Sequence, residues 1–501
     1  MKKIIRNIGL VWAFLSLGVA TATAQSDVDA LRYSLIPGNG TTARSLGLGG
    51  AIGAVGADQA VVLSNPAGLA QFKTNSFNIS LATNSLKNTA RFTDGASSIN
   101  NNFRFELLSI NAVWTNRKTI KGNPVKTGWV NTNFQLGYNR VNNFNRNTSY
   151  RRSGAPSSYT DYVADYVAGI NASELEATQE ELDQGFLYFE NMFWQSFLID
   201  SISSESYYAN YDAFVPGGLT QAGQIISEGG LGEYHMAFAG NYEHKVYFGA
   251  SINLQQVNYS ERNQFTEVDN PLTTNNWESY SFTRNLETSG VGVGGRLGVI
   301  VRANDNLRIG GTIHTPVVLN LTDNYFDELY VIQDDGFIDD LRTIDKEYSY
   351  RITTPARFGL QGAYIFGKKG MVSAEIETAD YSTMSITSDD FLFEDVNGEI
   401  VNNYGTATNF KIGGEYVLNS FRFRGGYSSI GNPFIDSDNY RRNIISGGFG
   451  IQERNWAFDL GISRDMQRDI YVPYEAQNLE SPLVRSDFNG TRLMLTLTNK
   501  F

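Results

Sequence analysis

The sequence predicts an all-β membrane protein: a 14-stranded antiparallel transmembrane β-barrel with an N-terminal hatch (plug) inside its lumen. Three observations lead to this fold class. Strand-forming aromatics and glycine are abundant, with 27 Tyr, 31 Phe and 49 Gly against 11 Pro in 501 residues. Short segments alternate between apolar and polar residues with a period of two. Short and long connections between these segments also alternate, as they do in outer-membrane barrels.

The first 24 residues have the features of a cleaved signal peptide. Three cations within the first six residues precede a short apolar run, 9–20, and Ala22-Thr23-Ala24 offers a small-residue cleavage site before Gln25. The apolar run is too short to remain as a membrane helix. We therefore expect an exported mature chain that begins near Gln25.

Residues 43–70, ARSLGLGGAIGAVGADQAVVLSNPAGLA, are rich in glycine and lead to the turn Asn65-Pro66-Ala67-Gly68. Glycine permits close approach of one backbone to another, and Pro66 fixes φ while removing a donor. No alternation of strand and helix surrounds the glycines, so a dinucleotide site is not indicated. Such a segment is expected to pack inside a larger structure.

This segment resembles the N-terminal hatch of FadL/TodX-type outer-membrane transporters, where an ARxLGxGGAxxAxxxD run leads to an NPAG element. The matching positions are Ala43–Ala51, Asp58 and Asn65–Leu69, with weaker likenesses at 311–316 (GTIHTP) and 354–364. The resemblance implies a hatch over 25–73 and a barrel over 74–501. It also implies that the hatch moves during transport, and the matching gating residues are Asn65, Pro66, Ala67 and Gly68.

Alternation is clearest in 246–254, where apolar side chains fall on one face and glycine, serine and asparagine on the other. Seven longer connections alternate with six short polar ones, which predicts an even number of strands with both barrel ends on one side. The longest outer connection is 145–232. The expected strands are 75–84, 103–115, 128–144, 233–242, 245–259, 277–302, 306–322, 347–366, 370–384, 407–418, 420–428, 442–452, 455–463 and 488–501.

The last predicted strand ends on Phe501. A terminal aromatic residue resembles the C-terminal signal by which outer-membrane barrels are recognised for assembly. The barrel-assembly machinery is therefore an expected partner, and the cell outer membrane the expected location.

Charged residues within the predicted strands fall on the lumenal face. Cations there could hold the carboxylate of a ligand by charge-assisted hydrogen bonds, or they could anchor the hatch. Those near the short turns fit anchoring better, because the base of the hatch is expected there. The candidates are Arg308, Arg357, Lys411, Arg422 and Arg424.

The long second outer loop has helical periodicity over 172–200 and a dense apolar cluster. The cluster could capture a hydrophobic ligand, or it could be a small core of the loop itself. The candidate capture residues are Phe186, Phe189, Met192, Phe193, Trp194 and Phe197.

Catalysis, cofactors and metal are not indicated. Cys is absent and only three His are present, without the spacing of a metal or haem site. The acidic run 323–340 could bind Ca²⁺ or bridge lipopolysaccharide through divalent ions, but it lacks EF-hand spacing, so a solvated acidic loop explains it better. The net charge of −12 argues against nucleic acid as a partner.

The function implied by the resemblance is passive passage of hydrophobic small molecules, such as long-chain fatty acids or aromatic hydrocarbons, through a monomeric plugged barrel. The expected partners are that ligand and the lipid and lipopolysaccharide of the outer membrane. Two alternatives stay open. One is a protein-docking barrel like the PorV-like shuttle of type IX secretion, and the other is a haem-binding barrel of the same family.

Overall fold

The computed structural model describes residues 26–501 except 37, 39, 94, 122, 177–186, 212–217, 270–276, 436–440 and 476–480. The signal peptide expected over 1–24 lies outside these residues. Phe186, the first of the capture candidates, lies outside them too.

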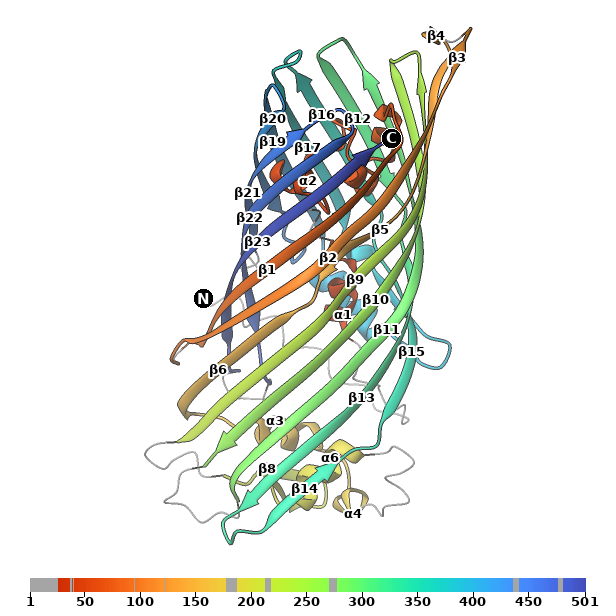
Figure 1. Cartoon of the computed structure of the whole chain (residues 1–501). Coiled ribbons are helices and arrows are strands. Elements are labelled where there is room, and N and C mark those ends of the chain that lie inside the picture. Colours follow the sequence, from red (N-terminus) through yellow and green to blue (C-terminus); the bar gives the residue numbers. More distant parts are fainter. Residues whose placement is uncertain are drawn as a thin grey trace.

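The described strands close into a 14-strand antiparallel barrel, which confirms the predicted fold class (Figure 1). The first and last strands pair along their whole length, from Ser76 opposite Lys500 to Phe92 opposite Val484. Four strands of the wall are interrupted and continue as a second segment. They are β5 with β6, β12 with β13, β15 with β16, and β17 with β18. The wall consists of β1 (Ser76–Phe92), β2 (Ser98–Arg117), β5 (Trp129–Asn143), β6 (Arg146–Ala155), β9 (Leu219–Tyr242), β10 (Val246–Val268), β11 (Trp277–Arg302), β12 (Leu307–His314), β13 (Val318–Gln333), β15 (Lys346–Thr353), β16 (Arg357–Ile365), β17 (Gly370–Asp380), β18 (Ser385–Thr387), β19 (Thr406–Leu418), β20 (Phe421–Ile430), β21 (Arg441–Gln452), β22 (Trp456–Tyr471) and β23 (Val484–Lys500).

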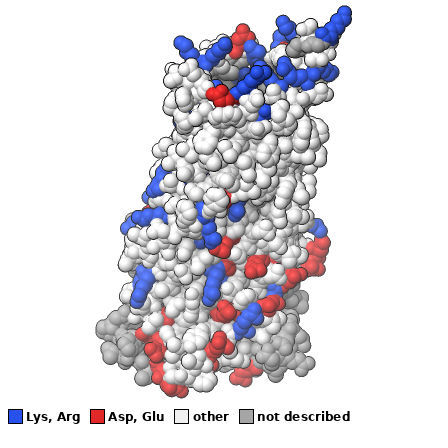
Figure 2. All heavy atoms as spheres, viewed as in Figure 1, with Lys and Arg blue, Asp and Glu red and all other residues white. Residues whose placement is uncertain are grey.

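The period of two places apolar side chains outside and polar ones inside. On β10, Phe248, Ile252 and Leu254 are exposed, whereas Asn253 and Gln255 are buried. Figure 2 shows a broad uncharged belt below the end that carries the short turns, and Lys and Arg gather at that end. An apolar outer band is what a barrel in lipid requires.

The strands on one side extend well beyond the predicted ends, which corrects the extent of the second outer loop. We expected that loop to span 145–232, but β6 and the first half of β9 belong to the wall. The alternation is weak there because segments outside the membrane need no apolar outer face. The expected acidic loop 323–340 is likewise mostly strand, formed by β13 and the hairpin strand β14 (Ile338–Arg342).

The described part of the outer loop forms a cap of short elements at the end of the barrel opposite the short turns (Figure 1). Its described helices do not form the single helical stretch expected over 172–200, because α4 ends at Leu175 and α6 begins only at Tyr188. The elements of the cap are α3 (Tyr159–Tyr166), α4 (Ala172–Leu175), α6 (Tyr188–Gln195), β7 (Ile199–Ser203) and β8 (Ser206–Ala209). Elsewhere, β3 (Thr119–Ile120) and β4 (Asn123–Pro124) form a hairpin at the short-turn end, while η3 (Tyr381–Thr383) and α7 (Glu394–Asn403) lie between β17 and β19.

The described residues of 26–73, which we call the hatch, lie inside the barrel (Figure 1). Helix α1 (Asp27–Ser34) contacts α7, and α2 (Ala43–Gly47) packs on β20–β23. The short helices η1 (Gln59–Leu63) and η2 (Pro66–Gln71) follow, and η2 packs on β5 and β9–β11. Each of the last three helices begins at a residue whose side chain accepts a backbone N–H, namely Thr42, Asp58 and Asn65. Among the described residues, no helix has both the length and the apolar character needed to cross a membrane.

Candidate functional site

The turn at Asn65 is held by the barrel wall. The Asn65 side-chain amide donates to Gln361 Oε1 at 3.0 Å and to the backbone carbonyls of Val299 and Gly311 at 3.3 and 3.4 Å. Its own oxygen accepts the N–H of Ala67 at 3.0 Å. Asn65 and Ala67 are fully buried, so the turn is enclosed between the hatch and the wall.

Two glycines of the wall let it approach this turn. A Cβ on Gly249 would lie 2.3 Å from the backbone nitrogen of Ala67, and one on Gly298 would lie 2.0 Å from Asn65 Oδ1. No larger residue fits at either position without displacing the turn. The contact therefore depends on glycine in two adjacent strands as much as on the hatch sequence.

A charged network fixes the other side of the hatch. Arg44 of α2 lies 3.2 Å from Glu415 of β19, and Glu415 also pairs with Arg424 of β20 at 2.7 Å. Arg424 in turn pairs with Asp459 of β22 at 2.6 Å. Burial alone would lower the pKa of Arg44, but Glu415 and Asp58 outweigh it and the pKa is raised. The guanidinium is therefore charged at every physiological pH.

The five cationic candidates divide among different roles. Arg308 donates to the carbonyl of Val55 at 2.8 Å and to Gln71, so it touches the hatch, as Arg424 does through Glu415. Arg422 differs from the expectation, because its described hydrogen bonds go to carbonyls of its own turn. Lys411 pairs with Glu375 at 3.0 Å and Arg357 with Glu377 at 3.6 Å, and both cations line a cavity between the hatch and the wall.

Sequence reasoning missed a row of amides on the inner face of β5. Asn131 donates to the carbonyl of Ala70 at 3.0 Å, Gln135 to that of Gln59 at 2.9 Å, and Asn139 accepts from the Thr41 hydroxyl. The signal was present, because Asn or Gln occupies every second position from 131 to 139 except Gly137. Amides both donate and accept, so they satisfy the irregular backbone of the hatch.

The cavity between the hatch and the wall has a volume of about 90 Å³. Its charged lining consists of the carboxylates Glu106 and Glu377 and six cations, Arg140, Arg296, Arg357, Lys411, Arg442 and Arg492. Four of them have a carboxylate within 3.6 Å; for Arg296 it is Glu233, which it binds with both terminal nitrogens, and for Arg442 it is Asp465. Two are less neutralised. Arg492 bonds to the neutral amide of Asn84 at 2.6 Å and forms no ion pair within the described chain. Arg140 is 4.0 Å from Glu106, and its buried Nε has no hydrogen-bond partner among the described residues.

The ladder between β2 and β5 is interrupted beside this cavity, where β6 lies against β1 and β2 through side-chain hydrogen bonds. Strands β2 and β5 pair only from Arg117 opposite Asn131 to Ser109 opposite Asn139, whereas β2 continues along β1 to Ser98. Beyond this point β5 bulges between Arg140 and Asn142, and the wall resumes with β6 on β9.

A second cavity, of about 100 Å³, joins the first to this break in the ladder. It shares Asn143, Arg442 and Arg492 with the first cavity and reaches Asn102 and Arg104 of β2. The cationic lumen and the break in the ladder are thus neighbours.

The candidate capture residues are mainly core residues of the cap. Met192 and Phe193 are buried, and Phe189 and Trp194 pack against the same core, which also contains Tyr159 and Phe282. Only Phe197 among the described candidates is substantially exposed, at 59%. The cluster therefore stabilises the cap, and a ligand could reach these side chains only if the cap opened.

The histidines have structural partners. His314 Nε2 lies 3.1 Å from the carbonyl oxygen of Ser64 in the hatch, and His235 Nδ1 lies 3.2 Å from Asn139. His244 lies in the turn between β9 and β10, where partial burial and nearby cations lower its pKa. Within the described chain, no group of three or more His, Cys, Asp or Glu is arranged to hold a metal ion.

A closed barrel with an apolar exterior and an N-terminal segment fastened inside it defines the class of plugged membrane barrels. Three solved structures share this fold. A Pseudomonas aeruginosa FadL homologue aligns over 92% of this chain and 98% of its own, with a TM-score of 0.54 and 12% identity. The P. putida toluene transporter TodX aligns over 93% of this chain and 99% of its own, with a TM-score of 0.52 and 14% identity. The monoaromatic hydrocarbon channel CymD also aligns over 93% of this chain and 99% of its own, with a TM-score of 0.50 and 11% identity.

The chain therefore has the fold of FadL/TodX-type barrels, as the hatch sequence predicted. Neither the protein-family models nor the curated proteins include a match to it.

Proposed function

We propose that this protein is an outer-membrane channel for hydrophobic small molecules that carry an anionic head, the chemistry of long-chain fatty acids. The observation that carries the proposal is the cavity between the hatch and the wall, where Arg492 has no carboxylate within 4.0 Å among the described residues and Arg140 has only Glu106, at 4.0 Å. A carboxylate could accept hydrogen bonds from both. The fold shared with a toluene transporter and a hydrocarbon channel supports a transport role over an enzymatic one.

The size of the cavities assigns them to the head of the ligand. At about 90 and 100 Å³ they hold a carboxylate and a few waters, but no long alkyl chain. The tail would have to displace protein, so passage of the ligand requires the hatch or the wall to rearrange.

The exit we propose is sideways, through the break between β2 and β5. The straight route to the short-turn end is filled by the amide row of β5 and by the ion pairs of Arg44. An alkyl tail that moved along this route would leave those polar groups without partners, at about 1–3 kcal/mol for each. The break next to Arg140 avoids this cost, because it lies beside the cavity and beyond the last paired residue of the amide row, Asn139.

Uptake of labelled oleate by cells that express the chain tests this function. Arg492→Gln should weaken oleate uptake at low concentration by about 10- to 100-fold, the equivalent of one charge-assisted hydrogen bond. Uptake of neutral toluene should not change. Arg422→Gln is the matched control, since that arginine bonds only to its own turn among the described residues.

Equal oleate uptake by the Arg492→Gln protein and the wild type, with normal surface assembly, would contradict the anionic ligand. No uptake of either ligand above an empty-vector strain would contradict transport itself. Co-purification of a secreted protein with the outer loops would then favour the docking alternative.

A further inference from the structure

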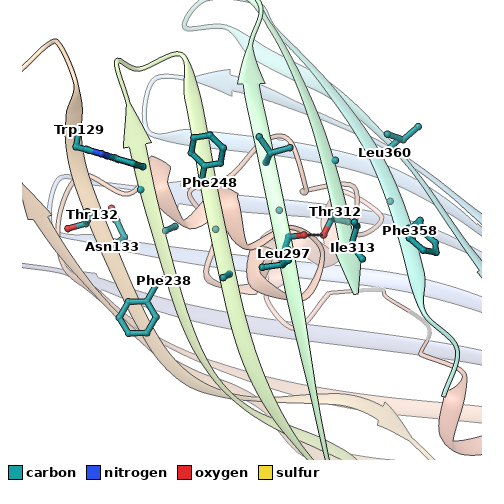
Figure 3. A pocket seen from close by; sticks show the side chains of 18 of the residues that line it. Trp129, Thr132, Asn133, Phe238, Phe248, Leu297, Thr312, Ile313, Phe358 and Leu360 are labelled. Carbon is teal, nitrogen blue, oxygen red and sulfur yellow. Dashed lines mark hydrogen bonds between the residues drawn. The ribbon is translucent and has the colours of Figure 1, made fainter. Parts of the chain in front are cut away.

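A groove of about 1130 Å³ lies on the outer face of the wall, across β5, β9–β12, β16 and β17. Figure 3 shows Phe238, Phe248 and Leu297 on neighbouring strands of one side, with Phe358 and Leu360 on the other. These side chains are between 48% and 70% exposed, so the groove opens to the outside of the barrel and not to the lumen.

The groove lies over the place where the wall contacts the hatch. The inward-facing glycines 249 and 298 let the backbone of the wall touch the Asn65–Ala67 turn, and both also line the groove. The outward positions between the large side chains are small, as at Ala250 and Gly311. A Cβ on Gly311 would have Val299 Cγ1, at 4.0 Å, as its nearest neighbour, so the floor of the groove is open there.

One end of the groove is positively charged. Lys118 is the only charged residue among the described residues that line it, and it lies at the short-turn end beside Trp129. Further cations gather at the same end, where Lys73, Arg302 and Arg117 are close enough to lower the pKa of His244. Figure 2 shows this concentration of Lys and Arg next to the uncharged belt.

We propose that this groove binds one anionic phospholipid of the periplasmic leaflet, with an acyl chain along the apolar floor and the phosphate at Lys118. The volume exceeds the usual ~300–1,000 Å³ of small-molecule pockets, so it accommodates an acyl chain. An amphipathic Trp beside a cation is the pairing that membrane proteins place at headgroup level. The occupant is fixed by charge complementarity, because an apolar groove with a cationic end matches an acyl chain with an anionic head.

Native mass spectrometry of the full-length barrel in detergent, with added 1-palmitoyl-2-oleoyl phosphatidylglycerol, tests the site. Gly311→Leu fills the floor of the groove and should reduce phosphatidylglycerol binding at least about tenfold, equivalent to about 1.4 kcal/mol. The matched control is Gly425→Leu, also outward-facing with open space around its Cβ but outside the groove. Lys118→Gln should abolish the preference for phosphatidylglycerol over phosphatidylcholine while leaving chain binding in place.

A second measurement needs no change to the groove floor. Phosphatidylglycerol with a brominated acyl chain should quench Trp fluorescence more in the wild type than in Trp129→Phe, because Trp129 lines the groove. The proposal is overturned if the two Leu variants retain lipid equally, or if Trp129 contributes nothing to quenching. A dimer that Gly311→Leu abolishes would overturn it too, since the groove would then hold a second copy. Oleate uptake is a separate readout, and none of these outcomes depends on it.

Discussion

Replacement of Glu415 by Gln is expected to release the α2 side of the hatch without disturbing the barrel. Glu415 is the only carboxylate in the described chain within 4 Å of Arg44, at 3.2 Å, and it also pairs with Arg424 at 2.7 Å. The side chains of Glu415 and Arg424 are 10% and 2% exposed, so solvent screens this network little. Its loss should therefore cost far more than the loss of a surface ion pair.

Removal of one partner of a buried ion pair typically costs 3–5 kcal/mol. The lower end of this range applies here, because Arg424 keeps its ion pair with Asp459 and Arg44 keeps its hydrogen bonds to the carbonyls of Gly56 and Ala57. About 3 kcal/mol corresponds to roughly a 100-fold rise in the equilibrium constant for hatch opening.

Hydrogen exchange measured by mass spectrometry on the barrel in nanodiscs reports this opening directly. Peptides covering 43–50 should exchange about 100-fold faster in Glu415→Gln, while peptides from β9–β11 stay unchanged. Heat-modifiable gel migration should show normal assembly, and sensitivity to polar antibiotics should rise. Glu243→Gln is the control, because that residue pairs with Lys245 only at 3.9 Å in an exposed turn. Unchanged exchange over 43–50 in an assembled Glu415→Gln barrel would refute the anchoring role of this network.

Three further changes test the rest of the hatch. Asn65→Leu removes the amide that binds Gln361 and two backbone carbonyls, so it should weaken docking of the hatch by about 1–3 kcal/mol. Oleate uptake or the leak of polar solutes should then change. If both stay at their wild-type values, the turn has no gating role. Gly298→Val should displace the same turn and speed exchange over 59–71, whereas Gly362→Val, whose Cβ meets open space, should not. Burial raises the pKa of Asp58 above 3.8, so the docked hatch takes up a proton at a higher pH than the released one. This contribution to docking is therefore present at low pH and lost as the pH rises through the raised pKa, and Asp58→Asn should abolish that part of the pH dependence of exchange.

Most of the barrel could be predicted from the sequence because a strand between lipid and a polar lumen must alternate between apolar and polar residues. The inner ends of β10, β11 and β19 agree with the expected limits within a residue. The outer ends of β9 and β22 extend further than expected, since no lipid imposes alternation there. The cap was harder to predict, because its helices are short and their apolar residues serve one shared core.

The sequence predicts which kinds of residue line the candidate site, but not which of them contact one another. Cations are expected to line the lumen because they occupy the polar positions of alternating strands. This alternation is a local property of the sequence. Which cation meets which partner depends on strand register and on the path of the hatch. Arg422 and Arg424 are two residues apart on one strand, yet one faces its own turn and the other a buried carboxylate pair.

The sequence by itself determined the barrel, its strand number and the placement of a glycine-rich segment inside it, because each depends on local periodicity or on a local motif. Only the tertiary structure decided that Arg140 and Arg492 line one cavity, that the ladder between β2 and β5 is interrupted, and that a groove lies over the hatch turn. Each of these arises where segments far apart in the chain meet. Their positions are set by the closure of the barrel around the hatch, and no local pattern in the sequence encodes that closure.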